Sequence, residues 1–394
     1  MKRRRWLGWG GAQCLGCVAL AHAQSTLPVA PAASDPSGWS MPQRFEPPDP
    51  ATDEGGLWAL MDREERRIRR SPFRIADAGL GSYLSAIACK LGAAHCPDIR
   101  VHLIRAPYFN ASMAPNGMMQ IWSGLLLRVD NEAQLAAVIG HEIGHYLLRH
   151  TVERLRDIKS RAAFAQFMGL FGVVGLVGQL AAMAGALAFS RDQEREADQL
   201  SIRLLRAARY DPREAAVVWG NLLDELRANP HFNPAQDSVL FATHPPSDER
   251  RDSLQALAAG GVGESFEAEY RTRLAPIRAE LLEDELKRGR PHESVALLGR
   301  LLRSEPDHAL LLHFRGEAYR QRGAAGDDAL ALADLLAAVR IGDAPATTHR
   351  ALGQLYTADG QSAAAREAWR RYLALAPEAP DAAMIRQRLE EMSR

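Results

Sequence analysis

The sequence has no excess of charge of either sign. Lysine plus arginine and aspartate plus glutamate number 48 each, so the formal net charge is zero. Without a basic excess, nothing draws the whole chain to nucleic acid, and we expect no nucleic-acid partner. A composition of 47% hydrophobic and 24% charged residues excludes collagen, coiled coil, a mostly disordered chain and a multi-span membrane protein. Its 394 residues indicate two to three domains.

The first residues are typical of an export signal. Residues 2–5 are basic, the stretch to Leu20 is uncharged, and Ala21-His22-Ala23 has the A-x-A form of a leader-peptidase site. We predict a signal peptide over 1–23, cleaved near Ala23, and a periplasmic protein. A lipoprotein leader ending before Cys17 is one alternative, and a twin-arginine leader is another.

Cysteine is scarce, with four in the whole chain, and only Cys89 and Cys96 remain after the predicted cleavage. An even pair in an oxidising compartment favours a disulfide over a metal site. Two buried thiols are the alternative. We expect no catalytic role for them in either case.

The order of sequence patterns predicts a mainly α-helical chain with a small β-sheet. Residues 24–56 are rich in proline, serine, aspartate and glycine, which predicts an extended linker. Helical periodicity starts near Leu57, and short β-like stretches lie at 99–104 and 118–122. We place one domain over 57–270.

Repeated helical pairs occupy the C-terminal third, over residues 274–394. Six positions there match the tetratricopeptide consensus in register, and they are Leu352, Gly353, Tyr356, Ala365, Trp369 and Pro377. This predicts an α-solenoid whose concave face holds an extended segment or a partner helix. A generic helical bundle is the alternative.

The motif that carries chemistry is His141-Glu142-Ile143-Gly144-His145, in a helix predicted from Glu132. Histidines four residues apart project from the same side of a helix, so both can hold one Zn²⁺. Glu142 is close enough to take a proton from a metal-bound water without being a ligand. The motif becomes a strong signal only with a third ligand.

A second predicted helix offers that ligand. Glu194 and Asp198 are four residues apart and share a face, whereas Glu196 lies about 200° around the axis from either. If Glu194 binds zinc, Asp198 accepts a hydrogen bond from a ligand imidazole. A solvated charge run is the alternative. His150, nine residues after His141, is expected to point away from the metal as a surface or capping histidine.

The spacing of these two motifs resembles the gluzincin metalloproteases related to the CAAX prenyl endopeptidases. With the leader and the repeats, the chain is similar to a periplasmic branch of that family that serves outer-membrane quality control. The resemblance implies a gluzincin-type protease domain followed by a tetratricopeptide solenoid, with one Zn²⁺ per subunit. It assigns the site residues as ligands His141, His145 and Glu194, catalytic base Glu142 and supporting acid Asp198.

The resemblance extends to Phe241-x-Thr243-His244-Pro245 and to Arg250. It implies that His244 can occupy the fourth zinc position and hold the enzyme latent. The loop carrying His244 must then move, because working zinc sites keep an open position. Arg250 or His244 is a candidate stabiliser of the transition state.

Residues 162–190 contain no charged residue and are long enough for a membrane span. One crossing would separate His145 from Glu194, which must meet at one metal. We therefore predict a helical hairpin that covers the active site or contacts a membrane surface peripherally.

The predicted reaction is hydrolysis of peptide bonds in unfolded or stalled outer-membrane proteins. Strand 118–122 is expected to pair with an extended substrate. The repeats are expected to contact such clients or the outer-membrane assembly machinery. Two other functions are open: a chaperone or scaffold with a structural metal site, and a zinc hydrolase acting on the cell wall.

Overall fold

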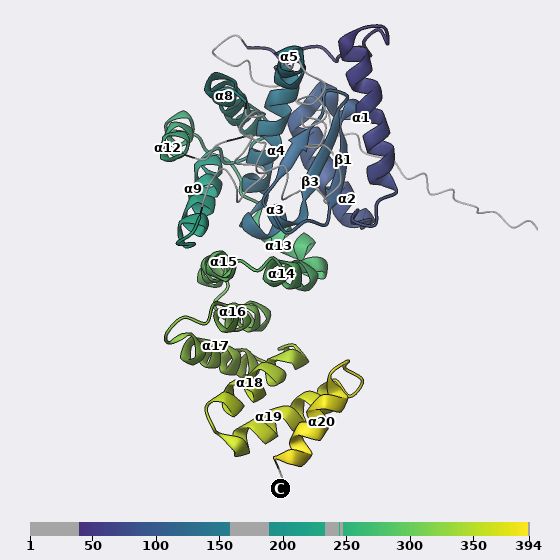
Figure 1. Ribbon diagram of the computed structural model, residues 1–394. Helices are drawn as coiled ribbons and strands as arrows, with labels where there is room; N and C mark the ends of the chain where they lie inside the picture. Colours follow the sequence, from purple (N-terminus) through teal and green to yellow (C-terminus); the bar gives the residue numbers. More distant parts are fainter. Residues whose placement is uncertain (1–38, 158–188, 233–243, 245–246, 393–394) are drawn as a thin grey trace, which may run out of the picture. The chain divides into compact units, whose positions relative to one another are not determined.

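The computed structural model describes residues 39–157, 189–232, 244 and 247–392 (Figure 1). The predicted signal peptide, residues 24–38 of the predicted linker and residues 162–188 of the predicted hairpin lie outside the described residues. None of the helices in the described ranges is both long and apolar enough to cross a membrane.

The small predicted sheet is present, with three strands. They are β1 (Arg100–Ile104), β2 (Ala111–Met113) and β3 (Met118–Trp122), in the order β1-β3-β2. Strand β3 runs parallel to β1 and antiparallel to β2, and all its side chains are buried. The predicted strands are confirmed, and β2 is a strand that the sequence analysis missed. Because β3 is paired on both sides, the expected pairing of 118–122 with a substrate is wrong.

Helices surround this sheet in the part of the chain up to Leu274. They are α1 (Asp53–Arg69), α2 (Ala78–Gly92), α3 (Ser123–Arg128), α4 (Glu132–Leu147), α5 (His150–Asp157), α8 (Arg191–Ala207), α9 (Glu214–Arg227), α12 (Asp248–Leu257) and α13 (Glu267–Leu274). Helix α4 is buried along its whole length and contacts β2, α2, α8 and α9. Figure 1 shows it between the sheet and α8.

Two glycines let α4 and α8 come close together. A Cβ added at Gly144 would lie 3.1 Å from the carbonyl oxygen of Ala197, and one at Gly140 would lie 3.0 Å from Ser201 Oγ. The Ser201 hydroxyl donates to the carbonyl oxygen of Ala137, 2.9 Å away. This contact brings the acidic start of α8 beside the end of α4.

The segment preceding α1 packs against the domain without forming a helix or strand. The Phe45 ring packs edge-on against Tyr146 of α4, with 5.1 Å between the ring centroids. Arg44 forms an ion pair with Asp98. Helix α1 begins at Asp53, four residues earlier than expected.

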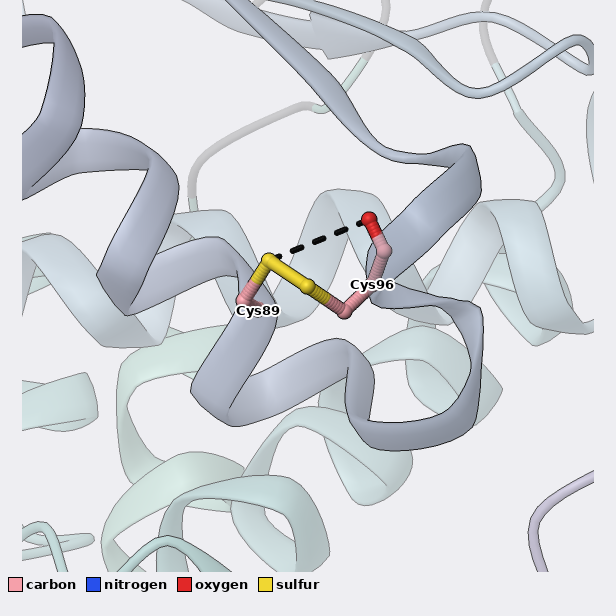
Figure 2. Close-up of a disulfide and its surroundings, with 2 residues drawn as sticks. All are labelled: Cys89 and Cys96. Atoms are coloured by element: carbon pink, nitrogen blue, oxygen red, sulfur yellow. Dashed lines mark hydrogen bonds between the residues drawn. A yellow bond between two sulfur atoms is a disulfide. The ribbon is translucent and has the colours of Figure 1, made fainter. Parts of the chain in front are cut away.

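A disulfide joins Cys89 and Cys96, seven residues apart, as predicted (Figure 2). It ties the last turn of α2 to the 3₁₀ helix η1 (Ala93–Asp98).

The C-terminal third is a solenoid-like series of helices. They are α14 (Arg278–Lys287), α15 (Pro291–Ser304), α16 (Ala309–Arg322), α17 (Asp327–Ile341), α18 (Ala346–Ala358), α19 (Ser362–Leu375) and α20 (Ala382–Glu391). The consensus glycine Gly353 faces the consensus tryptophan Trp369, where an added Cβ would lie 2.6 Å from the indole ring. The predicted fold class, a mainly α domain with a small sheet followed by a helical solenoid, is confirmed.

A buried cluster of charges connects the first tail helices to the domain that contains the sheet. Arg128 of α3 donates hydrogen bonds to Glu225 of α9 and to Glu285 of α14, each with a donor–acceptor distance of 2.8 Å. Arg288 donates to Glu285 and Glu293. Burial opposes ionisation of Glu285, but the charges of Arg128 and Arg288 outweigh it and hold its pKa below the ordinary range. Burial raises the pKa of Glu225.

Candidate metal centre

Helices α4 and α8 bring the three predicted ligands together. His141 Nε2 lies 3.1 Å from His145 Nε2, because the two side chains share one face of α4. Glu194, in the first turn of α8, places Oε1 3.3 Å from His145 Nε2 and Oε2 3.5 Å from His141 Nε2. All three side chains are buried.

His244 lies beside these three residues. Its Nδ1 is 2.7 Å from Glu194 Oε1 and 3.3 Å from His141 Nε2. One donor atom from each of the four residues lies within 4.8 Å of the others. The neighbouring motif residues Phe241, Thr243 and Pro245 lie outside the described residues.

The four residues fit a zinc ion. Tetrahedral coordination with metal–ligand bonds of about 2.0–2.1 Å separates donor atoms by about 3.3–3.4 Å. The distances from His141 Nε2 to the other three donors, 3.1, 3.3 and 3.5 Å, are close to this value. In the described part of the chain, the buried Oε2 of Glu194 accepts no hydrogen bond, so it is available to a cation. Imidazole and carboxylate donors are the set that zinc prefers.

Glu142 is buried next to the cluster, with Oε1 3.7 Å from His244 Nε2. That oxygen has no hydrogen-bond partner among the described residues. Burial raises the pKa of the Glu142 carboxyl. A carboxylate with a raised pKa is a stronger base than one in water, which suits proton transfer near neutral pH.

Asp198 lies beside His141. Its Oδ1 lies 2.9 Å from His141 Nδ1. Arg250 donates hydrogen bonds to both oxygens of Asp198, from Nη2 at 2.7 Å and from Nε at 2.9 Å. Burial opposes ionisation of Asp198, but the Arg250 charge and the His141 hydrogen bond hold its pKa below the ordinary range.

Arg250 also contacts Trp219 and Glu194. Its guanidinium lies 3.9 Å from the centroid of the Trp219 ring, and its Nη1 is 3.3 Å from Glu194 Oε2. These contacts indicate that Arg250 supports Asp198 and Glu194. The predicted stabilisation of a transition state by Arg250 stays a prediction.

The two histidines of the motif differ in their pKa values. Burial and Arg250 oppose protonation of His141, but Asp198 and Glu194 outweigh both and raise its pKa to about 9. Burial lowers the pKa of His145 well below its ordinary value. Because an imidazole binds a metal only through an unprotonated nitrogen, metal binding is expected to weaken at low pH.

The expectation that His150 is a surface or capping histidine is wrong. Its side chain is only 2% exposed, and its Nδ1 lies 2.9 Å from Nδ1 of His145. The expectation assumed one continuous helix, but α4 ends at Leu147 and His150 begins α5. No glycine or proline in Leu147-Leu148-Arg149 signals this break.

Two further residues near the site were not assigned from the sequence. Glu196 Oε2 lies 3.2 Å from His150 Nε2. The Phe189 ring stacks on the His145 ring, with 4.0 Å between centroids and 23° between planes. Neither residue stands at a position of the metal-ligand motif, so only the tertiary contacts show that they lie near the site.

The fold and the paired helix motifs define a metallopeptidase domain. Residues 76–258 match the family model described as Peptidase family M48. The match lies within the predicted domain 57–270 and confirms the resemblance drawn from the motifs.

The chain is also similar to particular proteins. The chain is 28% identical over 239 residues to the beta-barrel assembly-enhancing protease of Escherichia coli (strain K12), covering 56% of this chain and 47% of that protein. It is 36% identical over 122 residues to the mitochondrial metalloendopeptidase OMA1 of Arabidopsis thaliana, covering 31% of this chain and 25% of that protein. The chain therefore spans about half the length, or less, of these curated relatives.

Proposed function

We propose that this protein is a zinc-dependent endopeptidase of the periplasm that degrades misfolded or stalled outer-membrane proteins. The observation that carries the proposal is the buried cluster of His141, His145 and Glu194 with the carboxylate of Glu142 beside it. The name of the beta-barrel assembly-enhancing protease supports this class of client.

Each residue of the site has a role in peptide hydrolysis. His141, His145 and Glu194 would hold the zinc ion, which when bound polarises a water molecule and the scissile carbonyl. Glu142 takes a proton from the attacking water and passes it to the nitrogen of the leaving amine. Asp198 orients the His141 ring, and Arg250 keeps Asp198 ionised.

His244 gives this site a latent state. A fourth protein ligand leaves no open position for water, whereas catalytic zinc sites keep one. His244 must leave the cluster before a substrate is cut, and Arg250 then stabilises the oxyanion.

An extended client would add to the sheet at β2. This strand lies at the sheet edge and contacts α4, which carries the ligand histidines. Pairing through the backbone is independent of side chains, so it suits unfolded polypeptides. The tail helices, as tetratricopeptide repeats, would hold such clients or the outer-membrane assembly machinery.

A second function, a chaperone or scaffold with little protease activity, is favoured by one observation. His244 completes a four-residue donor set, which is the arrangement of a closed structural zinc site. In that case Glu142 has no catalytic task.

The test compares residues 24–394 as wild type, Glu142→Gln and His244→Ala. Each is assayed for cleavage of an unfolded β-barrel protein, and its zinc content is measured. We expect slow cleavage by the wild type and faster cleavage by His244→Ala. Glu142→Gln should lose about 10²–10⁴-fold in rate while keeping one zinc. If all three bind zinc and none cleaves, the scaffold function is favoured.

A further inference from the structure

We infer that His150 and Glu196 form a relay that orients His145 and fixes which of its ring nitrogens carries the proton. The inference rests on the zinc site of the proposed function. It gives a positioning role to two residues outside the ligand set.

The geometry determines the direction of each hydrogen bond. His145 Nε2 faces His141 and Glu194, at 3.1 and 3.3 Å, so this nitrogen must be unprotonated to bind a metal. The neutral ring then carries its proton on Nδ1, where it needs an acceptor. The nearest partner is Nδ1 of His150, at 2.9 Å.

His150 can accept this bond only if its own proton is on Nε2. That nitrogen lies 3.2 Å from the carboxylate of Glu196, which accepts it. Every donor along the chain from His145 through His150 to Glu196 therefore has an acceptor. The side chain of Glu196 is 59% exposed, so the relay runs from a buried ligand to solvent.

A break in the helix makes the relay possible. Arg149 has a left-handed φ of 60°, and the amides of Val152 and Glu153 both donate to its carbonyl as α5 begins. This turn directs His150 back onto His145. Arg149 is itself held, because its guanidinium pairs with Glu54 and lies 4.7 Å from the centroid of the Phe45 ring.

The two ligand histidines are thus oriented by different means. Nδ1 of His141 lies directly against the carboxylate of Asp198, whereas Nδ1 of His145 connects to the carboxylate of Glu196 through the imidazole of His150. Glu194 and Glu196 project from different sides of α8, and they serve opposite ends of the His145–His150 pair. Partners of ligand histidines set ring orientation and metal affinity.

The experiment measures zinc dissociation constants by chelator competition on residues 24–394. The informative pair is His150→Asn and His150→Leu, because the side chains have similar size but only Asn offers an acceptor. We expect His150→Leu to raise the Kd about 10–100-fold and His150→Asn to stay within a few-fold of wild type. Glu196→Ala should raise it several-fold. Asp192→Ala, which removes an acid 86% exposed on the same helix, should leave it unchanged.

Each other result overturns a defined part of the argument. If the wild type itself binds no zinc, the proposed function fails together with the relay. If the wild type binds zinc and both His150 variants match it, the relay fails alone. Equal weakening by Asn and Leu would assign His150 a packing role and also overturn the relay. If Glu196→Ala and Asp192→Ala have the same zinc Kd, Glu196 is not part of the relay.

Discussion

The carboxylate of Asp198 lies 2.9 Å from Nδ1 of His141, and both of its oxygens accept hydrogen bonds from the buried guanidinium of Arg250. Asp198→Asn keeps an acceptor for His141 but leaves Arg250 with only the carboxylate of Glu194, 3.3 Å from its Nη1, as an anionic partner. We expect the zinc Kd to rise about 10–100-fold, measured by chelator competition. A Kd equal to that of the wild type would contradict the supporting role of Asp198.

The buried charge cluster predicts unequal effects of two similar substitutions. Glu285→Gln removes a carboxylate whose pKa is held low by Arg128 and Arg288, so we expect a loss of about 3–5 kcal/mol. Glu225→Gln should cost less, because burial raises the pKa of Glu225 and disfavours its charge. Urea unfolding of both variants at pH 7 measures the difference. A larger loss for Glu225→Gln would refute this ranking.

Glu65 predicts acid sensitivity of the fold. Burial opposes its ionisation, but hydrogen bonds from His102, Arg100 and Arg69 outweigh burial and hold its pKa well below the ordinary range. A lowered folded pKa contributes stability above the unfolded value of about 4.3, and this stability is lost as pH falls below it. Glu65→Gln should flatten the dependence of the unfolding free energy on pH below about 4.3.

The control for Glu65 is Glu64→Gln. Glu64 forms an ion pair with Arg67, whose side chain is 69% exposed, so its loss should leave the acid limb close to that of the wild type. If the unfolding free energies of Glu65→Gln and Glu64→Gln depend on pH in the same way, the buried contacts of Glu65 do not cause the loss of stability in acid.

The disulfide is expected to contribute to stability and not to chemistry. Closing a loop as short as Cys89–Cys96 stabilises by about 2–3 kcal/mol in the chain-entropy model. The double variant Cys89→Ala, Cys96→Ala should lose about this amount in thermal or urea unfolding. Its zinc Kd should equal that of the wild type, and a large change would show that α2 and η1 shape the metal centre.

The sequence alone predicts the placement of side chains correctly where it depends on spacing within one helix. His141 and His145 share a face because they are four residues apart on α4, and Glu194 and Asp198 share a face of α8 for the same reason. Those two faces then meet, since Gly140 and Gly144 allow α8 to approach.

Prediction from the sequence failed where the backbone leaves regular structure without a signal residue. The break at Arg149 occurs at a residue that rarely adopts positive φ, so an angular projection from His141 placed His150 wrongly. Strand β2 has only three residues, too few to show alternation. Missing it made β3 seem an edge strand, although it is the central one.

The contacts of Arg128 also link the stability of the first domain to the presence of α14. A chain cut before α14 would lack Glu285 and leave the buried Arg128 with one of its two carboxylate partners, in a surface newly exposed to water. Loss of activity after such a deletion would then report damage to the protease domain as readily as loss of a client-binding site. The tasks of the two parts are better separated by single replacements on the outer helices, such as Met384→Asp on α20, where the native side chain is exposed.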